Sequence, residues 1–175
     1  NITGHTGLTA LLGSPVAHSI SPLMHNESFR LLGLDYVYLC FDVNEETLPA
    51  AVAGLKTCGI RGFNLTMPNK NKIVELLDEL SPEAQLIGAV NTVLNDNGKL
   101  IGYNTDGYGF MQSVRDAGHD ITGKNITVMG VGGASMAICA QSALDGAASV
   151  HIFARRTSRY WNRTQKFAEN LSAKT

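Results

Sequence analysis

The sequence lacks the features that mark a membrane protein or a nucleic-acid-binding protein. No apolar run approaches the roughly 20 residues that a helix needs to cross a bilayer. Neither sign of charge dominates, since 14 lysines and arginines face 15 aspartates and glutamates and the net charge is −1. A near-neutral balance provides no basic surface for a polyanion. We therefore expect a soluble protein whose partner is neither nucleic acid nor a membrane.

Cysteine and histidine are sparse and scattered. Cys40, Cys58 and Cys139 are an odd number, lie far apart in the chain and have no metal-ligand spacing. Such cysteines are typical of reduced, mostly buried thiols in a cytoplasmic protein. The five histidines have no metal-ligand spacing either. The sequence thus predicts a cytoplasmic protein without a metal site.

The chain contains a succession of short apolar strands and helices, as in a packed α/β protein. Hydrophobic residues make up 44 % of it and charged residues 17 %. Strands are expected at 8–12, 36–43, 63–65, 89–94 and 99–103, and helices from 22, at 47–57, at 71–77 and from 82. Asp96-Asn97-Gly98 predicts a hairpin between the last two strands, because Asn-Gly tolerates positive φ.

The first expected helix has a recognisable start. Ser21 is predicted to be its N-cap and Pro22 its first residue. Its apolar stripe is predicted to comprise Leu23, Met24, Phe29, Leu31 and Leu32.

The pattern changes after residue 103. A helix is expected at 107–117, followed by a buried strand at 126–129, a helix of small residues at 134–144 and a second strand at 150–154. A strand–helix–strand unit of this length predicts a parallel, Rossmann-type sheet. The expected fold class is α/β, with a mixed-sheet domain over residues 1–105 and a partial Rossmann-type domain over residues 106–175.

A glycine-rich loop lies between the first strand and the helix of this second part. Gly130, Val131, Gly132, Gly133, Ala134 and Ser135 form it. Small residues let the backbone approach a pyrophosphate, and a helix N-terminus favours its charge. Ser135 occupies the position of the third glycine in the usual fingerprint. The loop is therefore interpreted as a dinucleotide site, with a plain tight turn as the alternative.

The end of the second strand discriminates between cofactors. An NAD site usually has an acidic residue there, whereas this chain has Ala154, Arg155, Arg156 and Thr157, with no acidic residue between Asp145 and Glu169. Arginine forks onto a 2′-phosphate and stacks on adenine. This favours NADP over NAD, although a solvated basic turn is the alternative.

Three polar runs follow the short strands of the first part. They are Gly-Phe-Asn-Leu-Thr-Met-Pro-Asn-Lys at 62–70, Gly-Ala-Val-Asn-Thr at 88–92 and Gly-Tyr-Asn-Thr-Asp-Gly at 102–107. A lysine, asparagines, threonines and an aspartate are poor core material at strand ends. Together they suit a pocket for a polyhydroxylated small molecule. Considered alone, a lysine in a strand–helix loop such as Lys70 is usually just solvated, and the surrounding motif is what favours a functional role.

All three runs, in this order, resemble shikimate and quinate/shikimate dehydrogenases. The stretch Ser-Ile-Ser-Pro-Leu-Met-His-Asn at 19–26 and the Gly-x-Gly-Gly-Ala loop are also similar to that family. The resemblance implies that Ser19 and Ser21 hold the substrate carboxylate and that Lys70 and Asp106 carry the reaction. It also implies that Thr66, Asn91 and Asp106 bind ring hydroxyls, and that Tyr38 lines the pocket.

The expected function is the reversible, NADP-dependent oxidation of shikimate to 3-dehydroshikimate, in aromatic amino acid biosynthesis, or of quinate to 3-dehydroquinate. NAD is the alternative cofactor, because relatives with a similar Arg-Arg pair accept both. The rival interpretations are a non-catalytic shikimate- or quinate-binding relative and a dehydrogenase for another substrate. Family members continue well beyond residue 175, so we expect a chain cut at its C-terminus. A monomer or a homodimer is expected.

Overall fold

The computed structural model describes residues 1–158 and 160–172, and their contacts divide the chain into two compact units. Unit 1 comprises Asn1–Ser81 and Ala89–Tyr103, and unit 2 comprises Pro82–Gly88 and the chain from Asn104 onward. The predicted boundary between residues 105 and 106 stays a prediction. No helix of the described residues is long and apolar enough to cross a membrane.

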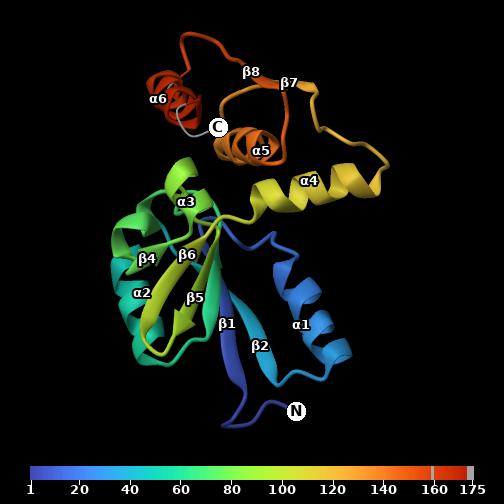
Figure 1. The fold of residues 1–175 in the computed structure, drawn as a ribbon. Coiled ribbons are helices and arrows are strands. Elements are labelled where there is room, and N and C mark those ends of the chain that lie inside the picture. Colours follow the sequence, from blue (N-terminus) through green and yellow to red (C-terminus); the bar gives the residue numbers. More distant parts are fainter. Residues whose placement is uncertain (159, 173–175) are drawn as a thin grey trace. The chain divides into compact units, whose positions relative to one another are not determined.

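Unit 1 is built on a six-stranded sheet, which is mixed as the sequence predicts but has one strand, at Glu79–Leu80, that was not predicted (Figure 1). Its spatial order is β2-β1-β3-β5-β6-β4, with β1 parallel to β2 and β3, and β5 antiparallel to β3 and β6. The strands are β1 (Gly7–Gly13), β2 (Tyr36–Asp42), β3 (Gly62–Leu65), β4 (Glu79–Leu80), β5 (Thr92–Asp96) and β6 (Lys99–Tyr103). The predicted β5–β6 hairpin is confirmed, with Asn97 at φ 52° and Gly98 at φ 93°.

The two faces of this sheet differ in polarity. Helix α2 (Leu48–Thr57) and the 3₁₀ helix η1 (Lys72–Leu76) contribute to a buried apolar core on one face. The strand residues of that core are Ala10, Leu12, Phe63, Leu65, Val93 and Leu100. The opposite face carries the cross-strand neighbours Leu11, Asn64 and Thr92. The polar side chains at the centre of the sheet therefore belong to this second face.

Helix α1 (Ser21–Leu32) packs beside β2, but none of its residues is fully buried. The predicted apolar stripe is wrong at Leu23, Leu31 and Leu32, which are each at least 70 % exposed. Of the predicted stripe, Phe29 does pack against the cluster of Leu11, Val16 and Tyr38. The residues of α1 that contact the sheet are His25, Asn26 and Phe29. Polar and aromatic side chains, rather than leucines, therefore form the contact face of this helix.

Unit 2 contains the strand–helix–strand arrangement that the sequence predicts. Strands β7 (Asn125–Met129) and β8 (Ser149–Phe153) are parallel and are connected by α5 (Gly133–Leu144). The other helices of the unit are α3 (Pro82–Ile87), α4 (Asp106–Asp116) and α6 (Trp161–Ser172).

The prediction that residues 126–129 form a buried strand is wrong. Burial alternates along β7, with Asn125, Thr127 and Met129 exposed and the residues between them half-buried. β8 continues the pattern, and Phe153 is 61 % exposed. The physical reason is that α5 packs on the sheet from one side, so alternate side chains point to an uncovered face.

Candidate functional site

The loop that follows β3 carries Thr66 and Lys70 and is tied to the ends of two other strands. Thr66 N–H donates to Leu12 O (3.0 Å), and Ser14 N–H donates to Met67 O (2.9 Å). Gly13 makes this approach possible, because a Cβ there would overlap the Thr66 side chain and lie 3.0 Å from Met67 O. The loop and the end of β1 are therefore one packed structure.

Lys70 is half-buried at the end of this loop. Its carbonyl oxygen accepts a hydrogen bond from Val90 N–H (2.8 Å), directly before Asn91. Asn91 is buried, and its N–H donates to Tyr103 O (3.0 Å). Backbone hydrogen bonds thus bring Thr66, Lys70 and Asn91 to the same end of the unit 1 sheet.

Asn69, next to Lys70, anchors the loop from inside. It is fully buried, and its Nδ2 donates to Val43 O (2.7 Å) at the end of β2. Its N–H donates to Thr66 O, and its carbonyl accepts from Ile73 N–H. Its Oδ1 is buried without a hydrogen-bond partner. Burying Oδ1 without a partner costs free energy. The hydrogen bond from Nδ2 to Val43 O offsets that cost.

Asn69→Ala is expected to lower the free energy of unfolding by about 2 kcal/mol, because the Val43 carbonyl loses its donor and a void replaces the amide. Urea denaturation measures this change. Asn71→Ala is the comparison, since Asn71 is exposed in the same loop, and its loss should be the smaller one because truncation at the surface leaves no void. Equal losses in the two variants would contradict the anchoring role.

A polar network crosses the second face of the unit 1 sheet. Tyr38 O–H donates to Asn64 Oδ1 (2.8 Å), and Asn64 Nδ2 donates to Asn91 O (3.2 Å) and to Thr92 Oγ1 (3.0 Å). Thr92 O–H in turn donates to Asn91 Oδ1 (3.1 Å). Two predicted residues, Tyr38 and Asn91, are therefore connected through two residues that the prediction did not select, Asn64 and Thr92. The signal that could have found Asn64 is its polar side chain alternating with the buried Phe63 and Leu65 on a short strand.

Tyr38 is held on several sides. Its ring stacks on His25 (centroids 4.2 Å apart, planes 14° apart), and its backbone exchanges two hydrogen bonds with the Asn26 side chain. Burial raises the pKa of the Tyr38 phenol well above its usual range and lowers the pKa of the His25 imidazole. The phenol therefore remains a proton donor to Asn64 throughout the physiological pH range.

A small cavity of about 180 Å³ opens on this network. Its lining includes His25, Tyr38, Asn64 and Thr92, together with Phe29 and Phe63. Hydrogen-bonding groups on an otherwise apolar wall are typical of small-molecule sites.

Ser19 and Ser21 lie where β1 leads into α1. Ser21 N–H donates to Ser19 Oγ (3.2 Å), and both side chains are half-buried. The predicted N-cap role of Ser21 is wrong, because Ile20 occupies the cap and Ser21 is the first residue of α1. The proline therefore lies one position further into the helix, and no side chain caps it.

Asp106 is the first residue of α4 and belongs to unit 2, whereas Lys70 belongs to unit 1. Its N–H donates to Asn104 Oδ1 (3.2 Å), and its side chain is half-buried. A carboxylate in the first turn of a helix is favoured by the helix dipole.

The glycine-rich loop has the local geometry that a pyrophosphate requires. Gly130 follows β7 at φ 108°, and Gly132 is the N-cap of α5. A Cβ on Gly132 or Gly133 would meet no heavy atom within 4 Å, so the backbone is accessible at both. The first amides of α5, which include those of Ala134 and Ser135, lack helical acceptors. The residues present therefore fit a bound phosphate group.

The predicted cofactor residues after β8 form an exposed basic turn. Arg155, Arg156 and Thr157 are exposed, and Ser158 N–H donates to Arg155 O (2.9 Å). Val131 and Ala154 lie together in the lining of a cavity of about 200 Å³ beside Trp161. Unit 2 therefore brings parts of both cofactor motifs to one cavity.

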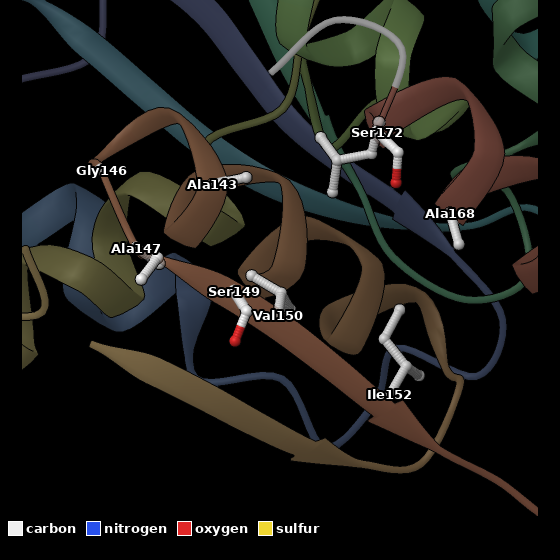
Figure 2. Close-up of a pocket in the computed structure, with 10 residues that line it drawn as sticks. Ala143, Gly146, Ala147, Ser149, Val150, Ile152, Ala168 and Ser172 are labelled. Atoms are coloured by element: carbon white, nitrogen blue, oxygen red, sulfur yellow. The ribbon is translucent and has the colours of Figure 1, made fainter. Parts of the chain in front are cut away.

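A cavity of about 550 Å³ lies elsewhere in unit 2, among the end of α5, β8 and α6 (Figure 2). Ala143, Gly146, Ala147 and Ala168 form much of its small-residue lining. None of the predicted site residues lines it. Among the described residues, no group of three or more histidines, cysteines, aspartates or glutamates could hold a metal ion.

The chain is similar to proteins of known family. A family model described as the shikimate dehydrogenase substrate binding domain matches residues 11–93. A shikimate dehydrogenase (NADP(+)) from Listeria monocytogenes serotype 4b is 52 % identical over 174 residues, covering 99 % of this chain and 60 % of the relative.

Solved structures of shikimate dehydrogenases and of one other reductase have the same fold as this chain. A shikimate 5-dehydrogenase from Listeria monocytogenes, in complex with shikimate and NAD, aligns with TM-score 0.96 and 50 % identity over 99 % of this chain and 60 % of that chain. The 5-ketofructose reductase of Gluconobacter sp. aligns with TM-score 0.90 and 35 % identity over 99 % of this chain and 61 % of that chain. The chain thus spans about 60 % of the length of these curated Listeria relatives.

Proposed function

Because the chain belongs to the shikimate dehydrogenase family, we propose that the protein catalyses the reversible NADP-dependent oxidation of shikimate to 3-dehydroshikimate. The observation that carries this proposal is the polar end of the unit 1 sheet, where backbone hydrogen bonds join the loop of Thr66 and Lys70 to Asn91. Several hydrogen-bonding groups around one position suit a ring that bears several hydroxyls.

Lys70 and Asp106 are the proposed catalytic residues. Oxidation of a secondary alcohol removes a proton from oxygen and a hydride from carbon, and NADP held by the glycine-rich loop would accept the hydride. Lys70 takes the proton as a neutral amine or, as an ammonium, stabilises the developing alkoxide. Asp106 accepts a hydrogen bond from a second ring hydroxyl.

The remaining site residues have proposed binding roles. Ser19 and Ser21 offer hydroxyls to the substrate carboxylate, Thr66 and Asn91 bind ring hydroxyls, and Tyr38 lines the pocket. The accessible amides from Gly132 to Ser135 hold the pyrophosphate, while Arg155 and Arg156 bind the 2′-phosphate that distinguishes NADP from NAD.

Two alternatives are distinguishable from this function. A family relative that binds shikimate or quinate without turnover would use the same polar pocket of unit 1 but transfer no hydride. A reductase for another polyol is compatible with the likeness to 5-ketofructose reductase.

Formation of reduced nicotinamide by the purified protein tests the proposal. Shikimate and quinate are each offered with NADP and with NAD, and we expect the highest kcat/KM with shikimate and NADP. Quinate turnover would extend the substrate range. Shikimate binding without any hydride transfer would replace the dehydrogenase with a binding module. Turnover of 5-ketofructose or its alcohol, without turnover or binding of shikimate or quinate, would reassign the substrate.

A further inference from the structure

The start of α4 is in unusually close contact with α5, and Gly107 makes that contact possible. Gly107 is buried directly after Asp106. A Cβ on it would overlap the carbonyl oxygen of Ala137 and lie 2.9 Å from both the carbonyl carbon of Ala137 and the Cβ of Gln141. The Ala137 atoms belong to the backbone of a helix, so they cannot turn aside as a flexible side chain could.

Helices α4 and α5 run in the same direction along this contact (Figure 1). Gly107 faces Ala137 and Gln141, and two turns later Arg115 Nη1 pairs with Asp145 Oδ2 (2.9 Å). Between these points Met111 is 2 % exposed. The N-termini of the two helices therefore lie at the same end of the pair.

That end carries two of the proposed functional elements. Asp106 is the first residue of α4, and the glycine-rich loop at 130–132 leads directly into α5. Both belong to unit 2, so their separation is set by contacts within one packed unit. The contact at Gly107 is the one directly beside Asp106, and it leaves no room for a Cβ.

We propose that Gly107 is a positioning residue that fixes the distance between the Asp106 carboxylate and the loop that holds the cofactor. This rests on the proposed function, which gives Asp106 and the loop their roles. A methyl group at position 107 moves the start of α4 away from α5. A displacement of about 1 Å at a reacting group is enough to cost about a hundredfold in rate.

The test compares Gly107→Ala with Gly109→Ala. Gly109 is the matched control, because it is an exposed glycine of the same helix with no heavy atom within 4 Å of a built Cβ. We expect Gly107→Ala to lower kcat about a hundredfold with the Kd for NADP nearly unchanged, since α5 keeps its own sheet contacts. Gly109→Ala should retain wild-type kcat and melt at a slightly higher temperature, because alanine favours helix.

A merely structural role would change the melting temperature but leave kcat per folded molecule at the wild-type value, and that result would overturn the proposal. If Gly107→Ala does not fold, Met111→Ala replaces it. Met111 lies one turn further along the same face of α4, so shortening it loosens the helix pair without adding an atom. It should lower kcat in the same direction, and an unchanged kcat would likewise overturn the proposal.

A crystal structure of Gly107→Ala separates this inference from the proposed function. If the wild-type protein turns over no substrate, the proposed function fails. A displacement of Asp106 from Ala137, absent in Gly109→Ala, would still support the positioning role. An undisplaced Asp106 would overturn it whether or not the wild-type protein is active.

Discussion

Replacing Lys70 with alanine is expected to lower kcat for shikimate oxidation about a thousandfold, which is within the range for loss of a general acid–base group. The Kd for shikimate should change only a few-fold, because Ser19, Thr66 and Asn91 still offer their hydrogen bonds. The carbonyl of residue 70 keeps its bond to Val90 N–H, since that bond belongs to the backbone. Steady-state kinetics together with calorimetric titration of shikimate measure the two quantities.

Lys72→Ala is the matched control. Lys72 is the next lysine in the chain, and its ammonium pairs with Glu75 (2.7 Å) at the surface. An exposed pair of this kind adds little to stability, because solvent screens it, and should contribute nothing to turnover. Full activity in Lys70→Ala, or equal losses in the two variants, would remove Lys70 from its proposed role.

Lys70→Arg separates the two chemical roles that a lysine can have. A guanidinium supplies a fixed positive charge but does not give up its proton at working pH. Substantial residual turnover would indicate that charge stabilisation of the alkoxide is sufficient. Loss equal to that of Lys70→Ala would indicate proton transfer by the amine.

The sequence was enough to predict the strands and helices wherever residue pattern and turn chemistry agreed. The β5–β6 hairpin followed from Asn97-Gly98, whose positive φ values the structure confirms. The strand–helix–strand unit followed from the glycines at 130–133, which open α5. In both places a local backbone requirement selects the residue, so the residue indicates the structure.

The predictions that depended on packing were less successful. The leucines of α1 suggested a buried stripe, yet Phe29, His25 and Asn26 make the contacts with the sheet. The apolar residues of β7 suggested a buried strand, yet Met129 is 86 % exposed. Which face of an element is covered depends on its neighbours in space, and apolar periodicity does not name those neighbours.

The site was predicted as a set of residues, and the structure adds the connections within unit 1. The sequence selected Tyr38 and Asn91, while Asn64 and Thr92, which link them, were passed over. Residues 64 and 92 are neighbours only through the antiparallel register of β3 and β5. That register is set by long-range pairing, so no local pattern could show it.

The Asn64 link leads to the second large expected effect. Asn64→Leu should lower the free energy of unfolding by about 3 kcal/mol, because the buried Tyr38 hydroxyl loses its acceptor and Asn91 and Thr92 lose an amide donor. Shikimate affinity should fall with it, since the Asn64 amide holds the backbone of Asn91. Urea denaturation and shikimate titration measure the two losses.

The double variant Asn64→Leu with Tyr38→Phe shows whether the loss comes from the hydrogen bond itself. Removing both partners leaves no unpaired hydroxyl, so the double variant should be more stable than the sum of the single losses predicts, by about 1 to 2 kcal/mol. Shikimate affinity should stay low, because Asn91 still lacks the amide of residue 64. In this double variant part of the lost stability is therefore recovered, while the lost shikimate affinity is not.

Asn95 provides the control for this cycle. It is a buried asparagine on β5 whose Nδ2 donates to Ile60 O (2.8 Å) and whose Oδ1 accepts from Gly98 N–H (2.8 Å), so its partners are backbone groups outside the network. Asn95→Leu should destabilise the protein, and its loss should add to that of Tyr38→Phe within about 0.5 kcal/mol. Additivity in the Asn64 cycle as well would mean that the Tyr38–Asn64 bond contributes nothing beyond burial. If the losses fail to add in the Asn64 cycle but do add in the Asn95 cycle, the Asn64 amide is the group that links the stability of Tyr38 to that of Asn91.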